Sequence, residues 1–426
     1  MSEKSFSTLS KIQPHPIENV DDLTNILVNW QFADMSRDPF ADMPGDMDVF
    51  AAFQTDYMNM QFQSSLMYIT REELDAASSF CELRLVLFNG TLWLHPKSRR
   101  NLNDSLPVKP EWVNIFVQQL REISRMGFNL PNIDFLVTTP DRPLCQGPAF
   151  SYARRRVKKD SKLFLVPYPT WNKDKLSDLR HSVLKANEKR QWQPWTSKLD
   201  QLFWRGSTTG IRFSKDLRVK KDDTDDVNDQ ELLVWQNITR YRLMLLANKD
   251  NHHKNSSRFN VSFSGIYAET PKRLHKYLMP FVSKPGDNIA DAAAFKYVLD
   301  VEGNSFSDRL RDLVGLENVL LKQEYPYIDF IGVGLQPWLH YVPIEQDLSD
   351  LGTMLDLVSS SGQSDLMKDW ARCKADWTRF YLSIDLPTVY LYKLLQRYEK
   401  SLDFKVSTPP PSGIFLKQVY QEEYQQ

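Results

Sequence analysis

The segment 132–143, NIDFLVTTPDRP, places an aspartate directly after an apolar run. We expect the run to be a buried strand, and in open α/β sheets ligands bind beyond the carboxyl ends of the strands. Pro140 and Pro143 fix φ on either side of Asp141 and hold its carboxylate on a stiff loop. A rigid, accessible carboxylate suits a general base. An aspartate that caps a turn after the strand fits the same residues, so this stretch alone leaves both interpretations open.

The segment 203–210, FWRGSTTG, contains a candidate anion-binding turn. Glycines let backbone amides approach a phosphate, and serine or threonine hydroxyls can donate to it. Arg205, Arg212 and Arg218 add positive charge in and after the turn. No Gly-Lys-Ser/Thr follows, so the segment is not a P-loop. An ordinary glycine–serine turn is the alternative.

A third candidate is the segment 299–310, LDVEGNSFSDRL, which we interpret as strand, turn and helix. A helix start presents backbone N–H groups that bind anions. Arg309 falls near the first helical turn, where a cation opposes the helix dipole at a cost of about 0.3–1 kcal/mol. A bound diphosphate would reverse that cost, and so would an ion pair with Asp308 or Asp312.

Other motifs are absent or lie in a poor context. Asp223-Thr224-Asp225 matches the D-x-D pattern that holds a metal in some sugar transferases, but no apolar strand leads into it and a solvated acidic loop explains it. His252 and His253 have no cysteine or acidic partner at ligand spacing. The G-x-S-x-G, H-E-x-x-H and G-x-G-x-x-G motifs do not occur. We therefore expect no metal site.

Composition excludes several classes of function. The net charge of -1 provides no basic field for nucleic acid. No apolar run approaches the length of about 20 residues that spans a membrane, and the N-terminus lacks the pattern of a signal peptide. The length of 426 residues favours two domains.

The cysteines and the glycosylation sequons give conflicting hints about the compartment. Cys81, Cys145 and Cys373 allow at most one bridge within the chain and no disulfide scaffold. The number of N-x-S/T sequons exceeds the chance expectation and hints at a secretory lumen, although unmodified surface asparagines explain them equally well. The sequons lie at Asn89, Asn103, Asn237, Asn255 and Asn260.

Helices and strands must position these candidates. The pattern predicts a helix capped by Thr70 with Glu73 at capping-box spacing, a hairpin turning at Asn89-Gly90, and a helix ending near Gly127. Further strands are predicted at 162–167, 201–207, 296–300, 317–324 and 340–344, and a C-terminal helix at 388–402. Short apolar runs alternating with helices indicate βαβ units with parallel sheets. Charged loops are predicted at 214–230 and 249–258, and a linker or rigid turn at 407–413.

Six segments together resemble glycosyltransferase family 90, which contains capsule-associated and Rumi-type UDP-sugar transferases. The resemblance covers roughly residues 65–400, and the order of the motifs makes it specific. In chain order the segments are LPNIDFLVTTPDRP, YPTW, LFWRGSTTG, KYVLDVEGNSFSDRL, VLLKQEYPY and LQPWLHYVPIEQDLSDL.

The resemblance implies an α/β fold of GT-B architecture, in which two Rossmann-like domains face a central cleft and a C-terminal helix packs back on the first domain. On this chain it implies an N-terminal arm at 1–60 and a first domain at 61–195 that carries the acceptor side and the catalytic aspartate. A second domain at 196–380 would bind the nucleotide sugar, and 381–426 would form the returning helix and a tail.

Position by position, the family's base matches Asp141, and the phosphate arginine matches Arg309. A further arginine usually follows the R-G-S turn; both Arg212 and Arg218 fit its spacing, and we prefer Arg212. The implied nucleotide-sugar-binding set is Arg205, Gly206, Ser207, Arg212, Asn304, Ser305, Phe306, Ser307, Asp308 and Arg309.

The implied activity is inverting transfer of xylose or glucose from UDP-xylose or UDP-glucose to a hydroxyl of a glycan or glycoprotein, with no metal or other cofactor. The alternative is a nucleotide-sugar or glycan-binding protein of the same fold without turnover. Family members work in the lumen of the endoplasmic reticulum or Golgi, but no targeting segment is visible, so the cytoplasm stays open. The disulfide set of the animal O-glucosyltransferases is also missing, which favours a xylosyltransferase.

Overall fold

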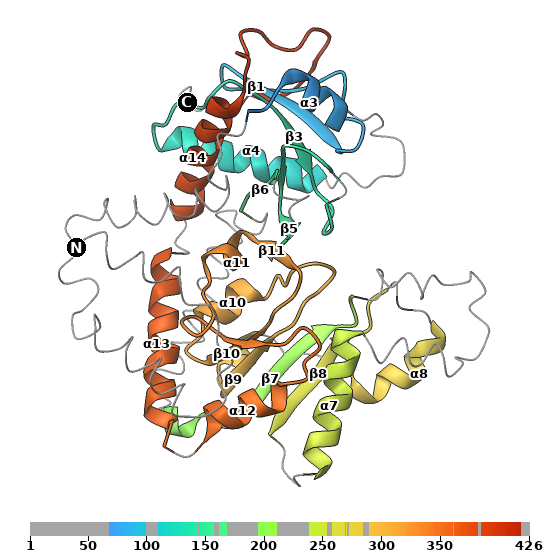
Figure 1. Cartoon of the computed structure of the whole chain (residues 1–426), viewed down its shortest axis with the longest axis vertical. Helices are drawn as coiled ribbons and strands as arrows, with labels where there is room; N and C mark the ends of the chain where they lie inside the picture. The colour runs from blue at the N-terminus through green and yellow to red at the C-terminus, as the bar shows by residue number, and fades with distance from the viewer. Residues whose placement is uncertain are drawn as a thin grey trace, which may run out of the picture.

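The computed structural model describes most of the chain between residues 68 and 418, organised around two main sheets (Figure 1). The described ranges are 68–98, 110–143, 145–156, 162–167, 195–210, 238–253, 258–268, 270, 272–283, 289–360, 362–381 and 385–418. The predicted arm at 1–60 and the predicted loop at 214–230 lie outside them.

A five-stranded sheet with the order β12-β10-β9-β7-β8 is parallel throughout, as the alternating pattern predicts. Its strands are β7 (Leu199–Ser207), β8 (Phe259–Gly265), β9 (Phe295–Asp300), β10 (Val319–Gln323) and β12 (Val342–Ile344). Its main helices are α7 (Thr239–His253), α10 (Leu310–Gly315), α12 (Leu351–Ser359) and α13 (Ser364–Tyr381). We call this part of the molecule the second half.

A six-stranded sheet with the order β13-β2-β1-β3-β4-β6 is mixed. Its strands are β1 (Leu83–Phe88), β2 (Thr91–Leu94), β3 (Ile133–Thr138), β4 (Ala149–Ser151), β6 (Leu163–Leu165) and β13 (Ile414–Gln418). With helices α3 (Arg71–Ala77), α4 (Pro110–Arg125) and α14 (Asp385–Ser401) it forms the first half. The predicted hairpin of β1 and β2 is confirmed, and with it the sheet is antiparallel from β13 to β3, which departs from the parallel pattern that βαβ units predict.

The physical reason is the predicted hairpin itself. Asn89 and Gly90 adopt φ of 45° and 70°, the left-handed values that a two-residue turn between antiparallel strands requires. A parallel partner would have needed a long crossover. The chain then adds β13 after the predicted turn at 407–413, a strand that the sequence pattern did not reveal.

The helix signals of the first half are confirmed. Thr70 caps α3 by accepting a hydrogen bond from the backbone N–H of Glu73 at 3.0 Å. Phe116, Leu120 and Ile123 of α4 are buried, and Gly127 ends that segment with φ of 84°. In the second half, the prediction of a loop at 249–258 is wrong up to His253, because α7 continues through this charged stretch.

The two halves share contacts and a core. The short strands β5 (Ala153–Arg155) and β11 (Tyr327–Asp329) pair between the two main sheets (Figure 1), and β11 leads into α11 (Phe330–Gly334). Helix α14 lies against α4, and its Tyr390 donates to the carbonyl of Leu165 at 2.7 Å. A continuous buried cluster includes residues of the six-stranded sheet, α14, β9 and α10.

The remaining described elements are short helices: η4 (Trp195–Ser197), η7 (Lys272–Leu274), α8 (His275–Leu278), η8 (Met279–Phe281) and α9 (Ile289–Ala292). None of the helices within the described ranges has the length and apolar character that crossing a membrane requires. Cys81 and Cys145 form a disulfide that does not include Cys373, which agrees with the limit of one bridge.

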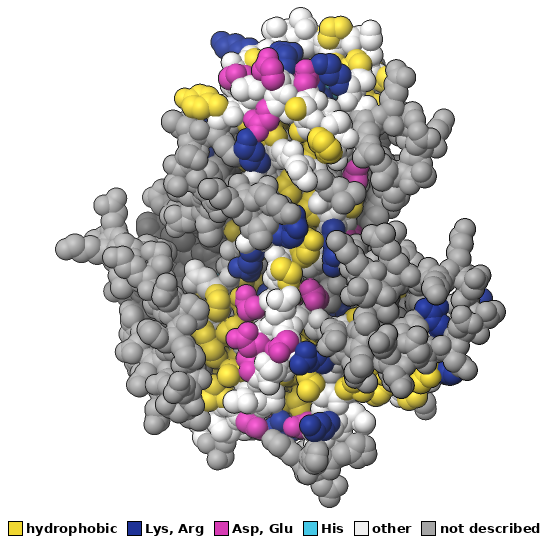
Figure 2. Space-filling model, turned by 45° about the vertical axis from the view of Figure 1, so that its right-hand side comes forward, with side chains coloured by type: hydrophobic (Ala, Val, Ile, Leu, Met, Phe, Trp, Pro, Cys, Tyr) yellow, Lys and Arg dark blue, Asp and Glu magenta, His cyan; other side chains and the backbone are white. Residues whose placement is uncertain are grey.

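The surface shows no strongly charged face in the view of Figure 2. Lysine and arginine side chains alternate with aspartate and glutamate side chains along the described part of this face. An extended basic patch, which nucleic-acid binding requires, is not seen there. This distribution agrees with the net charge of -1.

Candidate active site

A cavity of about 410 Å³ lies where the end of β3 meets the carboxyl ends of β7 and β9. Its lining comprises one carboxylate from the first half and, from the second half, a second carboxylate, an amide and a set of cationic, hydroxyl, glycine and apolar residues. These residues are Asp141, Phe203, Trp204, Arg205, Gly206, Ser207, Thr209, Arg240, Ser264, Leu299, Gly303, Asn304, Ser305, Phe306, Ser307, Asp308, Arg309 and Leu313. The structure thus brings together every predicted site residue except Arg212, which lies outside the described residues together with Arg218.

Asp141 lies on the loop between β3 and β4, and contacts fix this loop before and after the aspartate. Upstream, the backbone N–H and the hydroxyl of Thr139 both donate to Oε2 of the buried Glu82, each at 2.7 Å. Downstream, Cys145 is joined to Cys81. Because Cys81 and Glu82 are neighbours just before β1, one short segment secures both ends of the loop.

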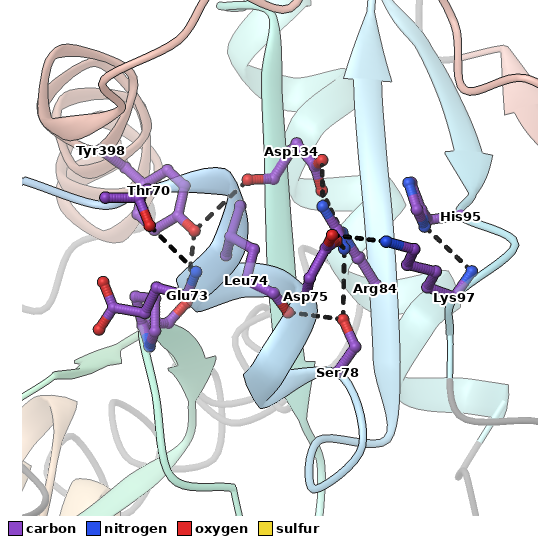
Figure 3. Close-up of polar contacts among 11 residues, drawn as sticks. Thr70, Glu73, Leu74, Asp75, Ser78, Arg84, His95, Lys97, Asp134 and Tyr398 are labelled. Atoms are coloured by element: carbon purple, nitrogen blue, oxygen red, sulfur yellow. Dashed lines mark hydrogen bonds and ion pairs between the residues drawn. The ribbon is translucent and has the colours of Figure 1, made fainter.

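Strand β3, which leads to Asp141, is held in turn by a buried ion network (Figure 3). Arg84 of β1, which is 1% exposed, forms two parallel hydrogen bonds at 2.8 Å with the carboxylate of Asp134 on β3. It also pairs with Asp75 of α3, which binds Lys97 on its other oxygen. Bidentate arginine–carboxylate pairs fix geometry as well as charge, so this network sets the position of β3 relative to β1 and α3.

Asn304 connects Asp141 to the second half. Its Nδ2 donates to Oδ2 of Asp141 at 3.0 Å, and its Oδ1 accepts from the backbone N–H of Gly210 at 3.2 Å. The backbone carbonyl of Asn304 accepts from Nε of Arg142 at 2.8 Å. The segment after β9 therefore contacts the aspartate loop at two consecutive residues.

Two arginines lie over the indole ring of Trp204. The guanidinium carbon of Arg309 is 5.1 Å from the ring and that of Arg240 is 5.6 Å from it. Burial, followed by the charge of Arg309, lowers the pKa of Arg240 to about 9. Burial also lowers the pKa of Arg309, although the nearby Asp300 opposes this. Both side chains remain cations at neutral pH, and an anion between or beside them would relieve their repulsion.

The contacts of these arginines leave charge available to a ligand. Arg240 donates from Nε to the carbonyl of Glu302 at 2.8 Å and from Nη1 to the carbonyl of Ser207 at 2.7 Å, and both acceptors are neutral. Nη2 of Arg309 and Oγ of Ser305 are buried and have no hydrogen-bond partner among the described residues. A buried donor without a partner costs about 1–3 kcal/mol, a cost that a phosphate oxygen would remove.

The glycine of the predicted R-G-S turn is required by close packing. A Cβ atom on Gly206 would meet Nη1 of Arg309 and would lie 2.7 Å from Cζ2 of Trp204. Arg309 therefore passes directly over the backbone of β7. This glycine makes room for the arginine side chain, whereas the sequence analysis assigned it to the approach of a phosphate.

Arg205 also lies differently from the expectation. It lines the cavity, but its guanidinium donates to the carbonyls of Trp204 and Asn260 at 2.9 and 2.8 Å, and to Oδ1 of Asn260 at 2.7 Å. These contacts tie β7 to β8. They also engage the side chain of Asn260, one of the five sequon asparagines.

Arg240 is the main residue that sequence reasoning missed. A signal was present, since Arg240 occupies the first turn of α7 and no acidic residue lies in that turn. The dipole argument applied to Arg309 would have selected it too. The prediction that Arg309 lies in the first helical turn is wrong. Arg309 is the N-cap residue of α10, which begins at Leu310 and spans six residues, so the cation precedes the helix.

No cluster of three or more His, Cys, Asp or Glu side chains suited to a metal occurs in the part of the chain that the structure describes. Asp223 and Asp225 of the D-x-D match lie outside that part. In the cavity, the carboxylate of Asp141 from the first half shares the lining with Asp308, three arginines and several hydroxyl donors from the second half. This set of groups can bind a polyanion and accept a proton from a neighbouring hydroxyl.

Comparison with known proteins places the chain in a family of transferases. Residues 48–419 match the family described as Glycosyl transferase family 90. Protein O-glucosyltransferase 3 of Homo sapiens is 33% identical over 290 residues, which cover 63% of this chain and 47% of that protein. Protein O-glucosyltransferase 2 of Danio rerio is 24% identical over 286 residues, with the same two shares. Protein O-glucosyltransferase 1 of Rattus norvegicus is 28% identical over 120 residues, 28% of this chain and 30% of that protein. The matches thus span between about a third and a half of these relatives.

Proposed function

The chain belongs to glycosyl transferase family 90, and on this premise we propose that it transfers a sugar from a UDP-sugar to a hydroxyl group of a glycan or protein. The observation that carries the proposal is that Asp141 of the first half and Arg309 of the second half line one cavity, although they lie far apart in the sequence. A base and an anion site on one cavity are what displacement of a nucleoside diphosphate requires.

The second half binds the donor in this proposal. Arg309 and Arg240 hold the diphosphate, whose negative charge grows as the bond to the sugar breaks. Positive groups that are already oriented toward this charge stabilise the transition state without reorganisation. Ser305 contributes a hydroxyl that has no hydrogen-bond partner among the described residues. The transfer needs no metal in this proposal, because two guanidiniums supply the charge that a divalent cation supplies elsewhere.

Asp141 acts as the general base. It removes the proton from the acceptor hydroxyl, whose oxygen then attacks the anomeric carbon from the side opposite the leaving diphosphate and inverts that centre. A positioned base typically contributes 10²–10⁴-fold. The hydrogen bond from Asn304 and the fixed loop ends keep the carboxylate in place for this step.

The donor sugar is xylose or glucose. The missing disulfide set favours xylose, whereas the names of the three relatives describe glucose transfer to proteins. The same names support a protein acceptor, and the sequons support work in the secretory lumen.

The decisive experiment incubates the purified full chain separately with UDP-glucose and UDP-xylose and measures the release of UDP, with and without acceptor glycans or glycoproteins. We expect release from one donor to exceed release from the other and to rise with acceptor. Arg309→Ala should weaken UDP binding about 10- to 100-fold, as loss of a charge-assisted contact worth 1.5–3 kcal/mol predicts. UDP binding without any release from either donor would instead identify a non-catalytic nucleotide-sugar-binding protein.

A further inference from the structure

Asn304 occupies a position between the two functional groups of the cavity. It follows Gly303 in the loop that carries Arg309, yet its amide group points to the aspartate of the other half. We propose that Asn304 is the positioning residue of Asp141 and makes the alignment of the base depend on the donor-binding loop. The inference rests on the proposed function, because a base has meaning only if transfer occurs.

The hydrogen bonds determine which way the amide of Asn304 faces. The backbone N–H of Gly210 can only donate, so the atom of Asn304 that faces it must be the carbonyl oxygen. The NH₂ group then faces Oδ2 of Asp141 and must donate. The orientation is therefore fixed by the chemistry of a third residue and does not depend on a choice between the two amide atoms.

This bond fixes the carboxylate from the side of the donor. Within the first half, Glu82 and Cys81 hold the ends of the loop. They contact Thr139 and Cys145, which lie two and four residues from Asp141 in the sequence. The amide of Asn304, in contrast, donates to the carboxylate itself. Arg142 strengthens the link, because its Nε donates to the backbone carbonyl of the same asparagine and its guanidinium lies 5.5 Å from the Tyr327 ring.

The consequence is a coupling between the donor and the base. Residues 303–309 line the cavity and carry both Arg309 and Asn304, and the hydrogen bond from Nδ2 of Asn304 to Asp141 is formed in this structure. A donor that stabilises this loop therefore also stabilises the carboxylate of Asp141 in its position. Such coupling favours proton transfer in complexes in which a donor is bound.

A purely structural role for Asn304 makes a different prediction, and two substitutions separate the roles. Asn304→Ala removes both hydrogen bonds of the amide. Asn304→Asp keeps an oxygen that accepts from Gly210 but loses the donor and adds a negative charge beside Asp141. If the contact to Gly210 were the important one, the aspartate variant would be the less damaged of the two, because it keeps an oxygen that accepts from Gly210. If Asn304 positions the base, the aspartate variant is the more damaged of the two.

The kinetic test measures kcat, KM for the donor and the pH dependence of kcat/KM for both variants, with Asn129→Ala as the matched control. Asn129 is exposed on the loop between α4 and β3 and does not line the cavity. Misplacement of a catalytic group can cost about 10²-fold, so we expect kcat to fall about 10- to 100-fold in Asn304→Ala while its Kd for UDP changes less than about threefold. Asn304→Asp should lose more in kcat, and its added negative charge should also weaken UDP binding.

The pH profile distinguishes the two roles. A hydrogen bond donated to a carboxylate favours its charged form, and a second carboxylate disfavours it. The acidic limb of kcat/KM should therefore move to higher pH in Asn304→Ala and further in Asn304→Asp. The other charged groups on the cavity, Arg205, Arg240, Asp308 and Arg309, are the same in all variants. An unchanged pH profile, or equal losses in kcat and UDP affinity, would overturn the inference.

A second measurement needs no turnover. Hydrogen exchange followed by mass spectrometry should show that UDP protects peptides from residues 303–309 and also peptides that contain Thr139 and Asp141. In Asn304→Ala the first protection should remain and the second should disappear. Protection of both segments in the variant would overturn the coupling even if the enzyme is active. A wild type that releases no UDP from any donor but shows the coupled protection would reject the proposed function and leave the coupling intact.

Discussion

The two halves of the molecule contribute to the cavity in opposite ways. Among the described residues, the first half supplies Asp141 alone, and the second half supplies the remaining lining. The segment around Asp141 is secured by a disulfide, by a buried carboxylate and, through β3, by a bidentate ion pair. The two arginines over Trp204 are held differently: Arg240 binds neutral carbonyls, and Nη2 of Arg309 has no hydrogen-bond partner within the described residues.

The difference follows from the two tasks. A general base works through position, since the proton transfer requires hydrogen-bond distance in the reactive complex. Its supporting groups should therefore be saturated with contacts. An anion site works through charge that the protein itself has not neutralised, because carboxylates that paired with the arginines would compete with the phosphate. In the first half, the groups that support the base therefore have their hydrogen-bond and ion-pair partners. In the second half, the arginines of the cavity keep charge that is available to a ligand.

The largest test of this comparison is Asp141→Asn. The substitution keeps the shape of the side chain but removes the base, so kcat should fall about 10²–10⁴-fold. The affinity for UDP should stay within about twofold, because the groups proposed to bind it belong to the second half. Single-turnover kinetics and calorimetric titration of UDP measure the two quantities separately.

A large loss of UDP affinity in Asp141→Asn would show that the two tasks are not divided between the halves. Full activity in this variant would remove Asp141 from the mechanism. Asn129→Ala provides the control for handling and folding, because that exposed side chain lies on the first half away from the cavity.

Two matched glycine substitutions test the division at an intermediate scale. Gly206→Ala would push a methyl group against Arg309 and Trp204 in the second half. Gly147→Ala would place its Cβ 2.6 Å from Cβ of Ala77, on the loop that carries Asp141. Overpacking of this kind costs about 1–3 kcal/mol. We expect Gly206→Ala to weaken UDP binding about 10-fold or more, and Gly147→Ala to lower kcat by a similar factor with UDP affinity unchanged.

The two variants carry the same chemical change, so each serves as the control for the other. Thermal unfolding followed by circular dichroism should be measured for both, because a loss of folded protein would lower kcat and apparent binding together. Equal effects of both substitutions on UDP affinity would contradict the division of labour.

Much of the second half could be predicted from the sequence. Its strands are short, apolar and separated by helical segments, and this pattern leaves few arrangements other than a parallel sheet. Residues 206–207 end β7 and residues 303–309 follow β9, and in a parallel sheet the carboxyl ends of the strands lie at one edge. The order of strands and turns in the sequence is therefore enough to predict that most of the candidate site residues lie together.

The first half depends on contacts that local patterns do not encode. Glu82 binds Thr139, Arg84 binds Asp134, and Cys81 reaches Cys145 across a separation of 64 residues. Three cysteines allow three pairings, and nothing in their spacing selects one. Strand β13, near the C-terminus, pairs with β2, near the start of the first half. The residues of β13 alone do not reveal this pairing, because it depends on the free edge that β2 offers.

The smallest expected effect concerns Lys374, a buried cation of the second half that does not line the cavity. Lys374 of α13 is 1% exposed and donates to the carbonyl of Leu313 at 3.1 Å. Burial, followed by the charge of Lys198, lowers its pKa from 10.5 to about 7, while Glu317 opposes this. Above pH 7 the unfolded chain thus binds a proton that the folded protein lacks, and stability should rise by about 1 kcal/mol between pH 7 and pH 8.

Lys374→Met removes this titration, so the rise between pH 7 and pH 8 should disappear and the variant should be the more stable protein at pH 7. Urea unfolding at the two pH values measures both effects. UDP affinity should not change, because Lys374 does not line the cavity. If the methionine variant loses UDP affinity as Arg309→Ala does, the buried cations of the second half act as one electrostatic unit, and the available charge is not confined to the arginines over Trp204. If the variant keeps its UDP affinity, the buried charge of Lys374 affects only stability, whereas the charges of Arg240 and Arg309 serve to bind UDP.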